Sequence, residues 1–442
     1  MRRKIFLIVC FFTFYNIACA QSSFRINNDK GKFTIDFELV NNLIVVPLEI
    51  NGLELSFLLD TGVYSTILFS LGDKDTLDLK NTEEIFLRGW GDGELIKALK
   101  STGNQVRLGE AISKNLTTYL VFDNPLGLSN RMGVPVHGII GYDLFRDFIV
   151  EIDYVKKILR FYNPDVYKGR KCTSCDELDL VFHRNKPYVN IEGEINGKTM
   201  PLKMLIDISS GDALWLFEND SGIKLPDNYF RDFLGFGIGG SVYGGRSRIE
   251  KINLGSFSFH DITASFPDSV YFRINTYDER NGSIRAQVLN RFHLTVDYAQ
   301  RKIRFKPNKN FDEPFEYDMS GVVIAHDGFT VIKDILRNPI ALREEDKNQT
   351  LAGNIVYKST YDVKFSLEPQ YRIAEIRPDS PASKAGLLES DILLKINGRP
   401  AFKYSLSEIT NLLSSENGKR IKLVIERNGM EKIVTFFLER IL

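Results

Sequence analysis

Residues 57–62 read Phe57-Leu58-Leu59-Asp60-Thr61-Gly62, an apolar run that carries an acid into a turn. An ionised carboxylate beside apolar side chains must be paired, hydrogen-bonded or neutralised by a raised pKa. Thr61 offers a hydroxyl for this purpose, and Gly62 lets a backbone N–H approach the acid closely. An Asp-Thr-Gly turn is common by itself. Residues 203–209 repeat the pattern, however, because a second apolar run ends there at Asp207.

The two acid-bearing runs belong to an internal repeat, in which residues 36–164 and 179–308 follow one plan. In each half an Asn-Gly turn precedes the acid, and a glycine-rich segment and a Leu-Gly pair follow it. The glycine-rich segments begin 146 residues apart (235 − 89), and the glycines of the two Leu-Gly pairs are also 146 residues apart (255 − 109). Short alternating apolar runs between Gly and Asn turns indicate strands. The repeat therefore predicts two equal, mostly β lobes.

These halves resemble the aspartic proteases, specifically the retroviral-type (retropepsin-like) lobe. Besides the Asp-Thr-Gly turn, residues 233–240 are similar to the flap of that family, and residues 138–145 are similar to its closing segment. The resemblance covers residues 24–310. It implies two β lobes related by a pseudo-twofold axis, with Asp60 and Asp207 meeting at the floor of a cleft beneath hairpin flaps.

The chemistry that the resemblance implies needs both acids. Two carboxylates about 3 Å apart share one proton, so the ionised one activates a water and the protonated one donates to the substrate carbonyl. Thr61 and Gly62 would support the first acid, and no metal or other cofactor is required. We expect flaps at residues 85–100 and 231–246 and a protein or peptide substrate. The flap residues singled out are Trp90, Gly91, Phe236 and Gly237. For Trp90 and Phe236, a place over the substrate and local hydrophobic packing are equally good interpretations.

The second lobe departs from the family pattern. Ile208 and Ser209 follow the second acid in place of a hydroxyl residue and a glycine, and Arg285 stands where the closing glycine is expected, in register with Gly141. We predict that Ser210 covers part of the loss by contacting Asp207. An inward Arg285 would pair with Asp207, hold it ionised and remove the shared proton, whereas an outward Arg285 would leave the dyad intact. The leading hypothesis is therefore an active endopeptidase, and the alternative is a catalytically silent peptide-binding homologue.

The C-terminal part, residues 365–442, resembles the PDZ domains of secreted bacterial proteases. Ser405 and Glu408 form a capping box before a helix with Leu406, Ile409 and Leu413 on one face. PDZ domains bind peptide chain ends by adding a strand to a sheet edge, so a peptide C-terminus is an expected partner. Residues 311–364 either complete this sheet or link it to residues 167–310, the second lobe, which follows the first lobe at 21–166.

Residues 1–20 read as a secretory signal peptide, with basic residues, an apolar run and cleavage after Ala20. This predicts a secreted or periplasmic protein, and a lipid anchor on Cys19 is the alternative. The sequence offers no membrane-spanning run after this segment. Lys plus Arg and Asp plus Glu both number 57, so the balanced charge gives no support to a nucleic-acid partner. In an oxidising compartment, Cys172 and Cys175 are predicted to form a disulfide.

Overall fold

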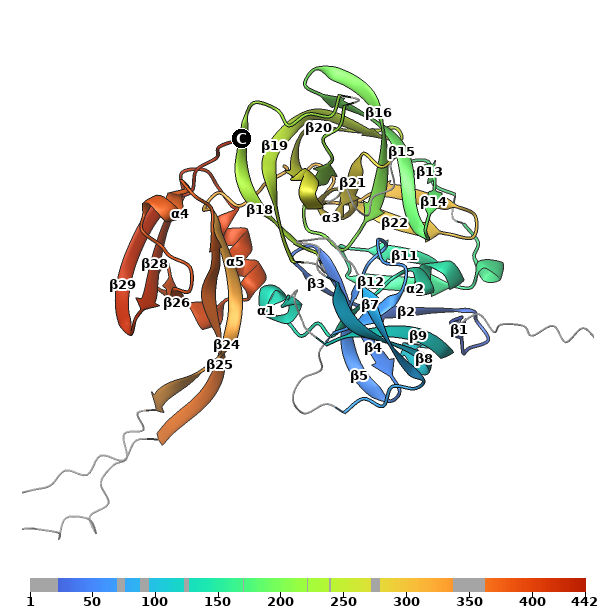
Figure 1. Cartoon of the computed structure of the whole chain (residues 1–442), viewed down its shortest axis with the longest axis horizontal. Helices are drawn as coiled ribbons and strands as arrows, with labels where there is room; N and C mark the ends of the chain where they lie inside the picture. Colours follow the sequence, from blue (N-terminus) through green and yellow to red (C-terminus); the bar gives the residue numbers. More distant parts are fainter. Residues whose placement is uncertain are drawn as a thin grey trace, which may run out of the picture.

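The structure is a computed structural model that describes residues 23–69, 76–87, 95–122, 127–169, 171–220, 222–237, 240–271, 279–336 and 362–442. The predicted signal segment with Cys19 lies outside these residues. The chain is mostly β, with two β lobes followed by a smaller unit of strands and short helices (Figure 1). The predicted fold class is therefore confirmed. Among the described residues, no helix has the length and apolar character to cross a bilayer.

The first lobe is built around one sheet that closes on itself. Its strands hydrogen-bond in the order β4, β5, β10, β6, β9 and β8, and β8 pairs again with β4. Strand β7 extends β8 as a hairpin, and β1 and β3 lie at the margins. The elements are β1 (Arg25–Ile26), β3 (Glu38–Val40), β4 (Leu43–Ile50), β5 (Leu53–Leu59), β6 (Thr66–Leu68), β7 (Thr82–Leu87), β8 (Ile96–Leu108), β9 (Ala111–Val121), α1 (Leu128–Met132), β10 (Gly138–Ile140) and α2 (Tyr142–Asp147).

The second lobe repeats this closed order with β15, β16, β21, β17, β20 and β19, and β19 pairs again with β15. Strand β18 extends β19 as β7 extends β8, and β14 precedes β15 as β3 precedes β4. The elements are β14 (Val181–His183), β15 (Lys186–Ile195), β16 (Lys198–Asp207), β17 (Leu214–Leu216), β18 (Tyr229–Gly237), β19 (Gly240–Leu254), β20 (Phe257–Pro267), β21 (Gly282–Arg285) and α3 (Ala286–Leu289).

A six-stranded sheet joins the two lobes and fixes the symmetry between them. Its order is β13 (Asp176–Asp179), β23 (Lys302–Pro307), β22 (Phe292–Asp297), β11 (Ile149–Asp153), β12 (Ile158–Tyr162) and β2 (Lys32–Asp36). In the repeat, Phe148 corresponds to Phe292, an offset of 144 (292 − 148). Glu151 and Thr295 are separated by the same 144 residues and are direct partners in the antiparallel β11–β22 pair. A pseudo-twofold axis therefore passes between these two positions.

The hairpin turns explain how the sequence sets this register. Asn51 and Asn196 both have positive φ angles, 48° and 51°, and each is followed by a positive-φ glycine. Two successive left-handed residues form the tight turn that matches the twist of antiparallel strands. The turns pair β4 with β5 and β15 with β16, so each acid-bearing strand is held by its predecessor. Buried side chains of both lobes then form one continuous core.

The C-terminal unit has its own sheet and core. The sheet order is β24 (Val322–Leu336), β25 (Asp362–Ile376), β26 (Ile392–Ile396), β28 (Arg420–Arg427) and β29 (Met430–Phe437), with β27 (Arg399–Pro400) beside β26. Helices α4 (Pro381–Lys384) and α5 (Leu406–Leu413) complete it. The capping box at Ser405 and Glu408 is present, and Leu406, Ile409 and Leu413 are buried on one face, as predicted. The core of the unit begins at Tyr317. The segment before residue 365 therefore contributes a strand to the sheet.

Candidate active site

Both candidate acids lie at the ends of equivalent strands. Asp60 follows β5, which pairs in parallel with β10, and Asp207 ends β16, which pairs in parallel with β21. Each acid lies at the end of a strand that is hydrogen-bonded to a neighbouring strand on both sides. The two side chains line the same cavity, which has a volume of about 710 Å³. The repeat thus brings together the two acids that the sequence predicted as partners.

Glycines shape the turn around Asp60. The backbone N–H of Gly62 donates to the Asp60 carboxylate oxygen Oδ1 at 2.5 Å. A Cβ at position 62 would lie 3.0 Å from that oxygen, and a Cβ at Gly141 would lie 1.8 Å from the Asp60 carbonyl oxygen. The second distance is far below any contact a side chain tolerates, so only glycine fits at residue 141 with this backbone.

The surroundings of Asp60 favour its protonated form. Burial, followed by the charge of Asp207, raises the pKa of Asp60 from 3.8 to about 6. The Gly62 N–H, the Ser209 hydroxyl and the charge of Lys186 act in the opposite direction. Asp60 can therefore hold a proton in mildly acidic solution, in which an ordinary aspartate is ionised.

Asp207 is held by side chains as well as by backbone. Ser209 donates to the Asp207 oxygen Oδ1 twice, from its N–H at 3.1 Å and from its hydroxyl at 2.8 Å. The structure corrects the prediction for Ser210, because Ser209 makes the contact that we expected from its neighbour. The N–H two residues after an aspartate folds back onto the carboxylate in such turns. This places Ser209 where Gly62 lies in the first lobe.

Arg285 points inward and pairs with Asp207. Its guanidinium lies 3.3 Å from the Asp207 oxygen Oδ2, and only 9% of the Arg285 side chain and 10% of the Asp207 side chain are exposed. The guanidinium also stacks on the Trp215 ring, with its carbon 3.6 Å from the ring centre. It donates to the hydroxyls of Ser210 and Ser283. Ser210 therefore positions Arg285 and not the acid.

A second, half-buried acid, Asp212, interacts with Arg285 through its charge. Asp212 accepts hydrogen bonds from the Trp215 indole at 2.7 Å and from Arg246 at 3.1 Å. Burial opposes the ionised form of Asp212, but the charges of Arg246 and Arg285 outweigh it and lower the pKa of this carboxyl. Burial also lowers the pKa of Arg285, and Asp207 and Asp212 oppose that change. The Trp215 ring that carries Arg285 is itself anchored through Asp212.

Thr61 links the two lobes beneath the acids. Its hydroxyl donates to the Ile206 carbonyl at 2.6 Å and accepts from the Ile208 N–H at 3.3 Å. Thr61 is 1% exposed, and Ile208 is fully buried in the apolar core. The first lobe thus supplies an interlobe bridge, while the corresponding side chain of the second lobe contributes packing alone.

The two hairpins β7–β8 and β18–β19 correspond to the predicted flaps. Phe236 and Gly237, at the end of β18, line the cavity with the two acids. The Phe236 ring lies against Arg131 of helix α1, whose guanidinium carbon is 3.2 Å from the ring centre. Phe236 therefore both faces the cavity and packs locally. Trp90 and Gly91, predicted at the tip of the first flap, lie outside the described residues.

Sequence reasoning missed a group of basic residues in the same cavity. They all come from the second lobe and are Arg184, Lys186 and Arg280, with His183 also in the lining. The turn at residues 184 and 185 has two positive φ angles, as has the turn at residues 41 and 42 of the first lobe. Aligning these turns places Lys186 at the position of Leu43. A cation at a position where the first lobe has an apolar residue is the sequence feature from which these basic residues could have been predicted.

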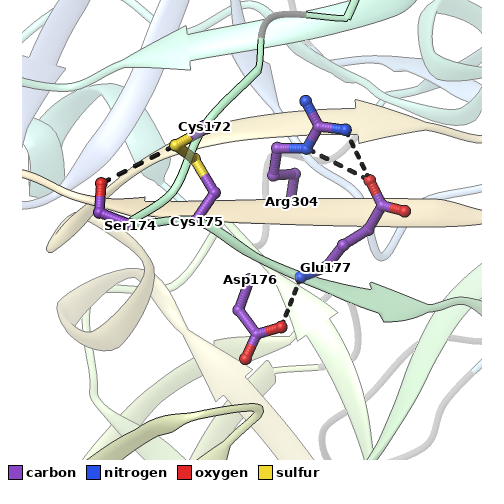
Figure 2. Close-up of a disulfide and its surroundings, with 6 residues drawn as sticks. All are labelled: Cys172, Ser174, Cys175, Asp176, Glu177 and Arg304. Atoms are coloured by element: carbon purple, nitrogen blue, oxygen red, sulfur yellow. Dashed lines mark hydrogen bonds and ion pairs between the residues drawn. A yellow bond between two sulfur atoms is a disulfide. The ribbon is translucent and has the colours of Figure 1, made fainter.

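Cys172 and Cys175 form a disulfide, shown in Figure 2. It lies just before β13, where Glu177 pairs with Arg304 of β23 at 2.9 Å. Asp176 accepts the Glu177 N–H at 2.8 Å. The disulfide thus closes a short loop at the start of the strand that borders the interlobe sheet.

Residues 46–144 match the family profile described as aspartyl protease, and residues 372–427 match the profile of the PDZ domain. The chain combines an aspartyl protease domain with a PDZ domain. The predicted resemblance is therefore confirmed. In the aspartyl protease domain, the matched part carries Asp60, Thr61, Gly62 and Gly141. In the PDZ domain, it runs from β25 to the end of β28.

Individual proteins are similar to this aspartyl protease–PDZ chain either over short segments or at low sequence identity. The aspartic proteinase from Irpex lacteus is 11% identical, with a TM-score of 0.39, and the match covers 64% of this chain and 99% of that one. The probable protease Eep of Enterococcus faecalis is 35% identical over 69 residues, 16% of each chain. A probable CtpA-like serine protease of Staphylococcus haemolyticus is 32% identical over 65 residues, 15% of this chain and 13% of the relative. The chain thus spans only 16% and 13% of the length of these two curated relatives.

Proposed function

We propose that the protein is an aspartic endopeptidase that hydrolyses protein or peptide substrates between Asp60 and Asp207. The observation that carries this proposal is the pair of acids in one cavity, one of which has a pKa raised to about 6. A shared or singly held proton is what water activation by two carboxylates requires. The endopeptidase class is supported by the family match, and the roles of the two acids are our inference from their environments.

The two environments assign different roles to the acids. Asp207 faces a guanidinium and two Ser209 donors, which all favour a carboxylate, so we assign it as the general base that takes a proton from water. The hydroxide equivalent attacks the peptide carbonyl carbon. Protonated Asp60 donates its proton to the carbonyl oxygen as the C–O π bond becomes a C–OH bond. When this tetrahedral intermediate collapses, one of its hydroxyls returns a proton to Asp60 and re-forms the carbonyl, and the C–N bond breaks as protonated Asp207 gives its proton to the departing amine.

A catalytically silent peptide-binding protein is the second candidate, and the Arg285–Asp207 ion pair favours it. Partnering of Asp207 by a cation prevents the acid from sharing a proton evenly, as an aspartic dyad does. In the first candidate, the raised pKa of Asp60 compensates by placing the single proton on Asp60. The two candidates therefore differ in whether Asp60 alone suffices as the proton donor.

Cleavage of an unfolded protein, such as reduced casein, separates the two candidates. We expect the endopeptidase to cleave below about pH 6 and to lose activity as pH rises through the pKa of Asp60. Asp60→Asn should lower cleavage by about a thousandfold or more, within the range for loss of a general acid. Asp29→Asn, at an exposed residue, is the matched control. An inactive wild type whose Arg285→Gly variant cleaves casein would establish the silent-binder alternative.

We also propose that the PDZ domain binds a peptide chain end by strand addition and so holds a substrate or partner near the protease lobes.

We further propose that residues 1–20 direct the export of the protein and are then removed. N-terminal sequencing of the mature protein would show Gln21 first if cleavage follows Ala20. A lipid-modified Cys19 at the N-terminus would show the anchored alternative, and an intact N-terminus would contradict both.

A further inference from the structure

The cavity that holds the two acids is strongly asymmetric in charge. Its first-lobe side is largely apolar and includes Leu58, Val63 and Ile139. The second lobe contributes four basic side chains to its lining, namely Arg184, Lys186, Arg280 and Arg285. Within the described residues, Asp60 and Asp207 are the only acids that line the cavity. Four cations against two acids leave an excess of positive charge, which increases when Asp60 is protonated.

The basic residues differ in how far the protein itself satisfies them. Arg285 is paired with Asp207. Arg280 donates to the Gly282 carbonyl at 2.9 Å, and its guanidinium carbon lies 4.9 Å from the centre of the Phe217 ring. Burial lowers the pKa of Arg280 to about 10, although the charges of Tyr188 and Asp207 oppose this.

The Lys186 side chain is half-buried. Its ammonium makes no hydrogen bond or ion pair to any residue that the structure describes. Burial and, after it, the charge of Arg280 lower the pKa of Lys186, and the charges of Asp60 and Asp207 only partly oppose this. A partly buried cation without a hydrogen-bonded partner is unfavourable. Such a position is stabilised when a ligand supplies the missing anion.

The backbone fixes where this cation lies. Arg184 and Asn185 form a tight turn with φ angles of 48° and 63°, and Lys186 is the first residue of β15. His183 and Lys186 are direct partners in the β14–β15 pair. At the equivalent turn of the first lobe, Leu43 packs against an apolar cluster. The charge is therefore a feature of one lobe, placed on a hairpin that lines the same cavity as the acids.

We propose that Lys186, with Arg280 in the lining of the same cavity, forms a subsite for a carboxylate side chain of the bound peptide. The protein then selects peptides with Asp or Glu near the bond that lies between the two acids. This inference rests on the proposed peptide-binding cleft, and it adds the chemical class of the peptide. A charge-assisted hydrogen bond between ammonium and carboxylate contributes about 1.5–3 kcal/mol, roughly a tenfold or greater preference.

The test uses a pool of synthetic 14-residue peptides of diverse sequence, with cleavage sites read by mass spectrometry at pH 5.5. At this pH free glutamate is mostly ionised, with a pKa of about 4.3, while Asp60, with a pKa of about 6, is mostly protonated. We expect acidic residues to be enriched about tenfold at one position within a few residues of the cut. Lys186→Met should abolish the enrichment, and Lys186→Arg should retain it. Lys198→Met, at an exposed lysine of β16, is the matched control.

A binding arm keeps this test independent of catalysis. The same pool is passed over immobilised Asp60→Asn protein, and the retained peptides are identified. If wild type cleaves nothing but the retained peptides are acidic, and Lys186→Met loses them, the subsite stands and the endopeptidase proposal fails. Cleavage without acidic enrichment would overturn the subsite and leave the protease proposal intact. Enrichment unchanged in Lys186→Met, or retention of no peptide at all, would also overturn it.

Discussion

The two acid-bearing turns keep the same strand register but support their carboxylates by different means. In the first lobe, Asp60 is followed by a glycine that donates from its backbone, and Gly141 packs against it without a side chain. In the second lobe, Ser209 donates twice, and Arg285 occupies the position that Gly141 has in the first. Strand pairing thus decides where each carboxylate lies, and the residues around the turn decide what charge and donors it meets.

The backbone differs at the closing residue. Gly141 has φ −156° and ψ −97°, whereas Arg285 has φ −117° and ψ −178°, an ordinary extended conformation. The chain therefore leaves β21 along a different path, which accommodates a side chain and directs it at Asp207. This difference explains why one lobe needs glycine and the other tolerates arginine.

The largest expected effect comes from giving the first lobe a side chain at the closing position. Gly141→Ala places a Cβ at about 1.8 Å from the Asp60 carbonyl oxygen unless the turn moves. We expect a loss of more than about 4 kcal/mol in the free energy of unfolding, measured by denaturant titration or seen as insoluble protein. Gly169→Ala, where the nearest atom is 3.7 Å away, is the control. A Gly141→Ala protein of normal stability would show that the two turns are interchangeable.

Removing Arg285 should have the next largest effect. Arg285→Gly leaves the buried Asp207 carboxylate without its cation and uncovers the Trp215 ring. Because loss of one partner of a buried pair costs about 3–5 kcal/mol, we expect destabilisation of about 3 kcal/mol at pH 7. Lys97→Gln breaks an exposed pair with Glu84 and should change stability by about 1 kcal/mol or less. If the two variants lowered the free energy of unfolding equally, Arg285 would not stabilise the Asp207 carboxylate.

The raised pKa of Asp60 predicts a stability difference that depends on pH. Its folded pKa of about 6 exceeds the ordinary 3.8, so folding favours the protonated form. The stability that this contributes is present below about pH 4 and is lost as pH rises through 6. Asp60→Asn should therefore stabilise the protein at pH 7.5 by up to roughly 3 kcal/mol and leave it nearly unchanged at pH 4. Melting temperatures at the two pH values measure this, and a pH-independent difference would contradict the assignment.

Thr61 gives the smallest expected effect and sharpens the comparison between the lobes. Thr61→Val removes the hydroxyl that serves the Ile206 carbonyl and the Ile208 N–H. Two buried backbone groups then lose a partner, and we expect a loss of about 1–2 kcal/mol in the free energy of unfolding. Ile208→Val, at the equivalent position, removes one methyl group and should cost about 1 kcal/mol by packing alone. Casein cleavage should fall in Thr61→Val more than in Ile208→Val.

The repeat was predictable from the sequence because hydrophobic alternation, Asn-Gly turns and glycine positions are local features. They specified two β lobes, the equivalence of Asp60 and Asp207, and the register that places Arg285 opposite Asp207. The sequence also located the C-terminal helix through its capping box. Each of these depends on residues near one another in the chain or on a constant offset between two copies.

Tertiary structure alone decided what surrounds the second acid. The direction of Arg285 depends on the path of β21 and on the Trp215 ring beneath it, which comes from β17. The choice of Ser209 over Ser210 depends on how the turn after β16 folds back. Lys186 reaches the cavity because the β14–β15 turn lines it together with both acids. Such contacts join segments that are distant in the chain. The charge and burial of the residues in these contacts depend on tertiary packing, which a local sequence pattern does not predict.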